Sequence, residues 1–324
     1  MSKGVYVGVN NLARKVTKIY CGVDNVARKV KKGYVGVGGV ARIFFSGEQK
    51  LEYHGTITPL STARSELSAT TVGNYALFGG GFGGSYLDTV DSYNSSLTRG
   101  TPSSLSVGRC DLAATTVGNY ALFGGGHRGS SLDTVDSYDS SLTRGTPSSL
   151  RVVSYDLAAT TVGNYALFGG GKGRRSIDTV DSYNSNLTRG TPSQLSVDRW
   201  DLAATTVGNY ALFGGGRGRG YLGNVDSYDS NLTKGTPTPL STARSELSAT
   251  TVGNYALFGG GFGGSYLDTV DSYNSNLTKG TPTPLSTARS ELSATTVGNY
   301  ALFGGGFGGS YLDTVDSYNS NLTK

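Results

Sequence analysis

Residues 73–81 read GNYALFGGG, and the same nine residues return from Gly118, Gly163, Gly208, Gly253 and Gly298. The spacing is 45 residues each time, so six units account for residues 55–324. A unit of this length that is built from short strands is typical of a β-propeller, in which each unit is one blade that buries its faces only against its neighbours. The repeat therefore predicts an all-β protein with six blades.

Each unit contains four candidate strands. In the first unit they are residues 67–72 (LSATTV), 75–78 (YALF), 89–93 (TVDSY) and 100–105 (GTPSSL). Blades converge on a central axis, so we expect LSATTV, which has the smallest side chains, to be innermost. Pro102 lacks a backbone donor and favours an edge position, which makes GTPSSL the outermost strand.

The frame of the repeat predicts how the ring closes. The last unit ends after its third strand at Lys324, whereas residues 55–60 (GTITPL) have the composition of an outermost strand. We expect residues 55–60 to complete the last blade, which would tie the two ends of residues 55–324 together and remove free sheet edges.

A family resemblance lies in the middle of the unit. A hydrophobic strand that ends in Gly-Gly, then a loop, then Val90-Asp91-x-Tyr93 resembles the kelch repeat, and the match recurs in all six units. The tryptophan that many kelch repeats carry before the last strand is missing from every unit. The resemblance implies a kelch-type propeller whose ligand-binding face is formed by the loop before the first strand and the loop between the second and third strands.

Residues 6–44 contain a second repeat of fourteen residues, with YVGVNNLARKV from Tyr6, YCGVDNVARKV from Tyr20 and YVGVGGVARIF from Tyr34. Their Asn-Asn, Asp-Asn and Gly-Gly centres tolerate positive φ, so each unit predicts a short β-hairpin. We expect residues 1–54 to form a basic segment that packs on a partner or on copies of itself. The units are similar to short repeats in structural proteins of bacteriophages and prophages of gut Firmicutes, which implies attachment to a phage particle. Solvated hairpin faces are the simpler explanation of the basic residues.

Charge is unevenly distributed along the chain. Residues 1–50 hold ten Lys or Arg against two acidic residues, a balance of +8, so the net charge of +5 leaves −3 for the remainder. Basic charge without interleaved exposed aromatics is a weak signal, and nucleic acid is an improbable partner. No apolar run approaches the roughly 20 residues of a membrane span, and the start MSKGVYVGVN does not resemble a secretory signal. We therefore expect synthesis in a bacterial cytoplasm, no membrane insertion and a final location in a virion.

The composition argues against an enzyme. The chain has only two cysteines, Cys21 and Cys110, and two histidines, His54 and His127. The cysteines lie in unlike contexts, so we expect neither a disulfide framework nor a zinc site. Two histidines also argue against multi-histidine metal chemistry and a Ser-His-Asp triad. The sequence predicts no catalytic residue, no metal and no cofactor.

The six units differ mainly in two windows. One is the loop before the first strand, which reads STARSE, SVGRCD, RVVSYD, SVDRWD and then STARSE twice; the other follows the glycine triplet and reads FGGSY, HRGSS, KGRRS, RGRGY and then FGGSY twice. In a four-stranded antiparallel blade both loops emerge on one face, and variation confined to one face is typical of a recognition surface. Neutral drift in permissive loops is the alternative.

These windows supply the candidate ligand-binding residues. Blades two to four contribute a mostly basic set: Arg109, His127, Arg128, Arg151, Tyr155, Lys172, Arg174, Arg175, Arg199, Trp200, Arg217, Arg219 and Tyr221. Blades one, five and six contribute three identical sets: Arg64, Phe82, Tyr86, Arg244, Phe262, Tyr266, Arg289, Phe307 and Tyr311. Acidic residues close the first window in every unit, from Glu66 onward, and we expect them and the Asp91 series to accept backbone hydrogen bonds instead.

Guanidinium groups bind carboxylates and phosphates, while Trp and Tyr stack on sugars or anchor interfaces. The sequence therefore favours a phage- or prophage-associated receptor-binding or adhesion protein whose partner is an anionic surface polymer or an acidic protein. The alternative is a structural or decorating virion protein whose face docks another particle protein. A cytosolic kelch adaptor is disfavoured because residues 1–54 hold no accompanying adaptor domain.

Overall fold

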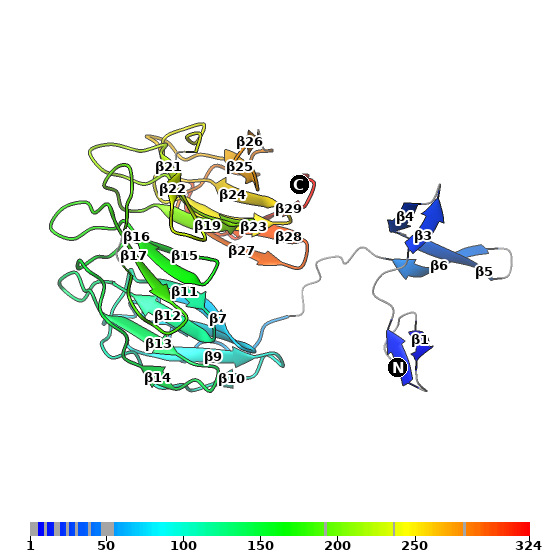
Figure 1. Cartoon of the computed structure of the whole chain (residues 1–324), viewed down its shortest axis with the longest axis horizontal. Helices are drawn as coiled ribbons and strands as arrows, with labels where there is room; N and C mark the ends of the chain where they lie inside the picture. Colours follow the sequence, from blue (N-terminus) through cyan, green and yellow to red (C-terminus); the bar gives the residue numbers. More distant parts are fainter. Residues whose placement is uncertain are drawn as a thin grey trace. The chain divides into compact units, whose positions relative to one another are not determined.

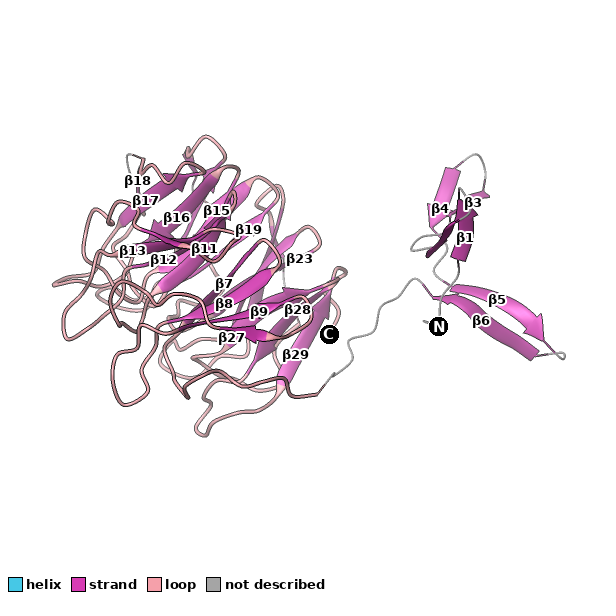
Figure 2. Ribbon diagram, turned by 90° about the horizontal axis from the view of Figure 1, so that it is seen from below, coloured by secondary structure: helices cyan, strands magenta, loops and turns pink. Residues whose placement is uncertain are grey.

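The computed structural model describes residues 55–190, 193–235, 237–280 and 283–324, together with six strands between residues 6 and 46 (Figure 1). The chain divides into two compact units, Met1–Gly55 and Thr56–Lys324. The described residues consist of strands and loops (Figure 2) and contain no helix with the length and apolar character needed to cross a membrane.

The first unit contains the three predicted hairpins. Each is a two-stranded antiparallel sheet, and the pairs are β1 (Tyr6–Val9) with β2 (Leu12–Lys15), β3 (Tyr20–Val23) with β4 (Val26–Lys29), and β5 (Lys32–Val37) with β6 (Val40–Ser46). The fourteen-residue period therefore identified the strand pairs correctly.

The second unit contains six sheets in sequence order, one for each repeat, as a β-propeller requires. Blade one is β7 (Ser68–Val72), β8 (Tyr75–Gly79), β9 (Val90–Asn94) and β10 (Arg99–Gly100); blade two is β11 (Ala113–Val117), β12 (Tyr120–Gly124), β13 (Val135–Tyr138) and β14 (Arg144–Gly145); blade three is β15 (Ala158–Val162), β16 (Tyr165–Gly169), β17 (Thr179–Asn184) and β18 (Ser193–Gln194). Blade four is β19 (Ala203–Val207), β20 (Tyr210–Gly214), β21 (Val225–Asp229) and β22 (Lys234–Gly235); blade five is β23 (Ser248–Val252), β24 (Tyr255–Gly259), β25 (Val270–Asn274) and β26 (Lys279–Gly280); blade six is β27 (Ser293–Val297), β28 (Tyr300–Gly304) and β29 (Val315–Asn319).

The strand order within the blades is the predicted one. The small-residue strand is innermost and packs against the same strand of the next blade, as β7 does against β11. Threonines link these strands, and Thr70 Oγ1 lies 2.9 Å from Thr116 Oγ1. The fourth strand is shorter than predicted and ends at Gly100, because Pro102 cannot donate to a longer ladder. Beyond it the chain crosses to the next blade, where the Ser103 carbonyl accepts a hydrogen bond from the Tyr138 hydroxyl at 2.9 Å.

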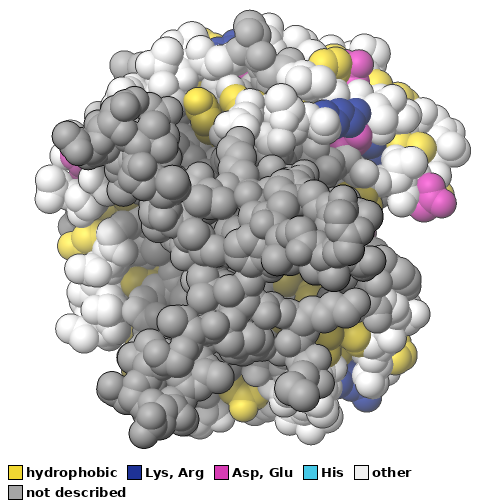
Figure 3. All heavy atoms as spheres, turned by 90° about the vertical axis from the view of Figure 1, so that its right-hand side faces the viewer, with side chains coloured by type: hydrophobic (Ala, Val, Ile, Leu, Met, Phe, Trp, Pro, Cys, Tyr) yellow, Lys and Arg dark blue, Asp and Glu magenta, His cyan; other side chains and the backbone are white. Residues whose placement is uncertain are grey.

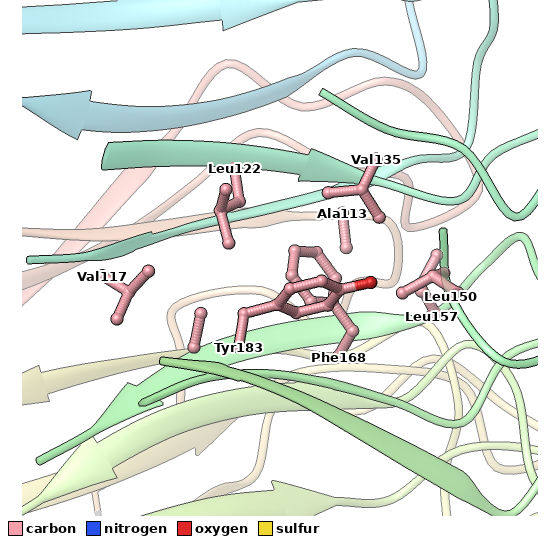
Figure 4. Close-up of a cluster of buried hydrophobic side chains, with 9 residues drawn as sticks. Ala113, Val117, Leu122, Val135, Leu150, Leu157, Phe168 and Tyr183 are labelled. Atoms are coloured by element: carbon pink, nitrogen blue, oxygen red, sulfur yellow. The ribbon is translucent and has the colours of Figure 1, made fainter. Parts of the chain in front are cut away.

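The core lies between blades. Five clusters each join valine and leucine side chains of one blade to the alanine, phenylalanine and tyrosine of the next. In the cluster between blades two and three, Val117, Leu122 and Val135 face Phe168 and Tyr183 (Figure 4). Each buried Phe packs edge-on against its buried Tyr, as in the Phe168–Tyr183 pair with centroids 6.0 Å apart.

Among the described residues, no equivalent cluster joins blade six to blade one. Val297 and Val315 of blade six are 47% and 62% exposed, whereas the equivalent Val117 and Val135 of blade two are 1% and 3% exposed. Figure 3 views the molecule from the right-hand side of Figure 1 and shows hydrophobic side chains scattered among other described residues. The described propeller therefore has an open seam, defined here as the unpaired faces of blade six and blade one.

Residues 55–60 do not complete the last sheet as predicted. Blade six has three strands, and residues 55–60 form no strand. The Thr58 carbonyl instead accepts a hydrogen bond from the Tyr93 hydroxyl of blade one at 2.8 Å, as Ser103 does from Tyr138 of blade two. Each connecting segment is thus hydrogen-bonded to the blade that follows it in sequence. Residues 55–60 are bonded to blade one in this way and do not join the sheet of blade six.

Candidate ligand-binding face

The two variable windows meet in every blade through backbone hydrogen bonds. In blade two, the Cys110 amide donates to the His127 carbonyl at 3.1 Å, and the His127 amide donates to the Cys110 carbonyl at 2.8 Å. The six pairs are Ser65–Phe82, Cys110–His127, Tyr155–Lys172, Trp200–Arg217, Ser245–Phe262 and Ser290–Phe307. Because only main-chain atoms make the bridge, these positions can carry very different side chains without changing the local fold.

Each second window is a small hairpin that presents its tip to solvent. A bridge between residues 127 and 131 closes this hairpin in blade two, and equivalent bridges close those of blades one and three to six. Arginines at the tips of blades two to four are exposed: Arg128, Arg174, Arg175 and Arg219. Arg151, from the first window of blade three, is exposed as well.

Below these tips, side chains from all six blades form what we call the aromatic belt. The belt consists of two runs of side-chain contacts. The first run comprises Phe82, Tyr86, His127 and Tyr155. The second run comprises Lys172, Trp200, Arg217, Tyr221, Phe262, Tyr266, Phe307 and Tyr311. Neighbouring ring centroids within blades and across blade boundaries lie 5.2–5.8 Å apart, as for His127–Tyr155 at 5.2 Å and Tyr86–His127 at 5.8 Å. His127 and Tyr155 therefore continue the Phe82–Tyr86 pair of blade one, and Tyr221 continues the Phe and Tyr pairs of blades five and six.

Two cations lie over the Trp200 ring. Lys172 Nζ lies 4.2 Å from its centroid, and the Arg217 guanidinium carbon lies 5.8 Å away. Arg217 also lies 5.4 Å from the Tyr221 ring. Two of the predicted basic residues are thus held by cation–π contacts, and a ligand would meet Trp200 together with these cations.

A ring of acidic residues surrounds the axis on the same face. Each follows the first member of a variable pair and has a left-handed backbone, with φ between 52° and 57° from Glu66 to Glu291. Five successive backbone hydrogen bonds link them, from the Asp111 amide to the Glu66 carbonyl through to Glu291 and Glu246. A cavity of about 380 Å³ is lined by Asp111, Asp156, Asp201, Glu246 and Glu291 and by the leucine after each acid.

This acidic ring was not among the predicted site residues. We expected its side chains to accept backbone hydrogen bonds, whereas the carboxylates line the cavity and it is their backbones that bond to each other. Crowding has an electrostatic cost: burial raises the pKa of Asp156 to about 8, with Asp201 and Asp111 adding to the effect. Burial likewise raises the pKa of Asp201 to about 7, with Glu246 adding to it. The acids recur at one position in every repeat, which is the sequence signal that identifies such a ring.

Five predicted ligand-binding arginines lie in the interior instead. Their side chains are 0% exposed and pair with the aspartates of the third strands: Arg64 with Asp91, Arg109 with Asp136, Arg199 with Asp226, Arg244 with Asp271, and Arg289 with Asp316, at 2.5–2.9 Å. The aspartates also accept backbone hydrogen bonds, as expected, including one from Ser106 to Asp136 at 3.1 Å. These arginines do not reach the face, because the residue directly before the first member of each pair points inward.

The described residues of blade three do not form this ion pair. Ser154 occupies the arginine position and donates to the Gly170 carbonyl at 3.0 Å. Asp181 accepts a hydrogen bond from the Arg151 amide, but its Oδ1 has no partner among the described residues. Burial raises the pKa of this carboxyl. Blade three therefore contains a buried carboxylate with no buried cation beside it.

No protein-family model matches the chain, and no curated protein matches it.

Proposed function

We propose that this chain is a non-enzymatic binding protein that engages its partner with the variable loop face of the propeller. The observation that carries the proposal is the bridged pair in every blade, which holds two variable side chains on invariant main-chain hydrogen bonds. A fixed scaffold with variable residues gathered at one surface is how many recognition sites are built. The aromatic belt and the tip arginines supply the residue types that anchor interfaces.

The charge pattern favours an extended anionic partner. The exposed arginines Arg128, Arg174, Arg175 and Arg219 come from three adjacent blades, whereas the axis carries the acidic ring. An anion would be repelled from the axis and attracted to the tips, so a polymer that crosses the tips of blades two to four fits better than a small ligand at the centre. A teichoic acid, an acidic polysaccharide or an acidic protein surface has this chemistry.

The resemblance of both repeats to kelch and phage structural proteins suggests the setting. In this proposal the propeller is a receptor-binding or adhesion module of a phage or prophage particle, and residues 1–54 attach it to the particle or to further copies of the chain. The alternative is a structural or decorating virion protein, in which the same face docks another protein of the particle.

Binding of the full chain to intact bacterial cells and to isolated wall polymers tests this proposal. The tip variant combines Arg128→Gly, Arg174→Gly, Arg175→Ser and Arg219→Gly, which installs the residues of the FGGSY loops at these positions. We expect saturable binding that salt weakens and that the tip variant loses. A charge-matched control replaces Lys15, Lys18, Lys29 and Lys50 with serine, and should bind like the wild type.

The outcomes separate the alternatives. Unchanged binding by the tip variant would contradict the anionic-polymer contact and transfer the site to the aromatic belt. Loss of binding in the control variant alone would place the contact in residues 1–54. Failure to bind any cell or polymer would contradict the receptor-binding role and favour docking within the particle.

A further inference from the structure

Blade two carries a pair unlike any other on the face. Its bridged positions are Cys110 and His127, where three other blades have Ser and Phe. The remaining cysteine and histidine of the sequence, Cys21 and His54, belong to the N-terminal segment. Two rare residues from separate windows of the same repeat are thus directly opposite each other.

The fold brings a third donor to this pair. Cys110 Sγ, His127 and a carboxylate oxygen of Asp111 offer ligand atoms that all lie within 4.8 Å of one another. Side chains of successive residues in an extended strand point to opposite faces. The backbone of Asp111 is not extended but left-handed, with φ of 53°. Its side chain therefore lies on the same side as that of Cys110, and Asp111 Oδ2 lies 3.1 Å from Cys110 Sγ.

We propose that Cys110, Asp111 and His127 form a binding site for a divalent transition metal ion of the zinc class. Sulfur, imidazole and carboxylate together are donors that Zn²⁺ takes in proteins, and three protein ligands leave one coordination position open. The site shares Asp111 with the acidic ring, so further carboxyl groups lie around the same cavity. The adjacent acidic residue is Glu66, whose carbonyl accepts the Asp111 amide hydrogen bond at 3.1 Å.

The surroundings of His127 suit a metal ligand. Its Nδ1 lies 3.4 Å from the Tyr86 hydroxyl, which comes from blade one. A ligating histidine ordinarily bonds through its second ring nitrogen to a polar group that sets the ring orientation. Cys110 is buried and has no disulfide partner among the described residues, so its thiol is available as a ligand.

The competing explanation is purely structural. In that reading His127 continues the aromatic belt in place of Phe, and Cys110 is a small residue in place of Ser. The repeats themselves provide the variants that separate the two, because Cys110→Ser and His127→Phe reproduce the pair of blades one, five and six. Both substitutions should therefore leave the fold intact.

The test uses the reduced, chelator-treated full chain and titration with Co²⁺, followed by competition with Zn²⁺. We expect one metal ion per chain, thiolate-to-cobalt charge-transfer absorption and a rise in Tm on addition of zinc. Cys110→Ser and His127→Phe should each weaken binding by about 100-fold or more, since even supporting residues of metal sites contribute 10–100-fold. Cys21→Ser and His54→Gln should leave binding unchanged.

Three results would overturn the proposal: no binding of either metal, binding that survives Cys110→Ser and His127→Phe, or cobalt spectra without a thiolate band. The last would exclude Cys110 as a ligand. The metal site is independent of the proposed partner, because the tip variant changes no metal ligand. The metal titration and the cell-binding assay can therefore each give a negative result without affecting the other.

Discussion

Arginine has two roles in this chain, and its place in the loop decides which. An arginine directly before the first bridged position, such as Arg109, enters the interior and pairs with an aspartate. An arginine at a hairpin tip, such as Arg128, stays in solvent. A charged pair in the interior is costly to break, because the partner that remains is buried without compensation.

Arg109→Ser is therefore expected to destabilise the protein by about 3 kcal/mol. The substitution removes the buried cation of Asp136 and leaves Arg144, which is more exposed, as its cationic partner. The variant converts blade two to the arrangement already present at Ser154 of blade three. Urea denaturation followed by fluorescence measures the effect. Arg128→Ser is the control and should change stability by less than about 0.5 kcal/mol. Equal midpoints for the two variants would show that the buried pair contributes nothing.

Among the elements, the second strand of each blade ends in a glycine that lies against the next blade. A Cβ on Gly124 would lie 2.7 Å from Phe168 Cε1, and Gly79, Gly169, Gly214 and Gly259 meet the following phenylalanine in the same way. Gly304 of blade six has no such phenylalanine, and its nearest neighbour would be Val315 at 3.2 Å.

Gly124→Ala is expected to cost about 1–3 kcal/mol, because the methyl group forces apart two packed blades. Gly304→Ala should have a much smaller effect, since the open seam leaves room for adjustment. Thermal unfolding of both variants beside the wild type measures the difference. Equal losses would mean that blade six packs on blade one as the other blades pack on each other.

At this scale, much of the fold could be read from the sequence. The period identified the blades, and the small side chains of LSATTV identified the inner strand. Leu97 shows what could not be predicted: it has φ of 58° in a position that favours Gly or Asn. Its equivalent Leu187 packs against the core, and the Asn94 side chain accepts hydrogen bonds from the Ser96 and Thr98 amides in this turn.

The candidate site was predicted less well, for a physical reason. The sequence predicted that both windows lie on one face, and the bridges place them side by side. The inward or outward direction of Arg64 and Arg109 depends instead on local backbone turns. The left-handed Asp111, which brings the acid toward Cys110, also leaves no mark in composition. Sequence patterns therefore located the face, whereas the buried arginines and the acidic ring required the structure.

For the whole molecule, the acidic ring predicts a stability that falls as pH rises. The Asp201 pKa is raised to about 7, first by burial and then by Glu246 and Asp111, with Lys172 and Arg217 opposing. Its unfolded value is about 3.9. Between these values the folded state binds more protons than the unfolded state, so stability decreases from about pH 4 to pH 7.

Asp201→Asn should remove this contribution while keeping a residue that tolerates the left-handed backbone. We expect the variant to be more stable than the wild type at pH 8 and nearly equal near pH 4. Tm measured across this range in the presence of a chelator checks the effect. Parallel curves would contradict the assignment.

The open seam makes a second prediction at this scale. Blades that contact only their neighbours behave as a linear array, and those at its ends open most readily. Amide hydrogen exchange should therefore be fastest in β27–β29 of blade six and slowest in blades three and four. Uniform protection of all inner strands would contradict an open arrangement.

The main-chain bridge between paired positions also affects how the repeat units can recombine. Both members of a pair are encoded within one 45-residue unit, and nearly identical flanks surround them. Homologous recombination between units would therefore transfer a complete pair into a scaffold that already accepts it. A single event could therefore exchange a complete pair of side chains between blades while the main-chain bridge is kept.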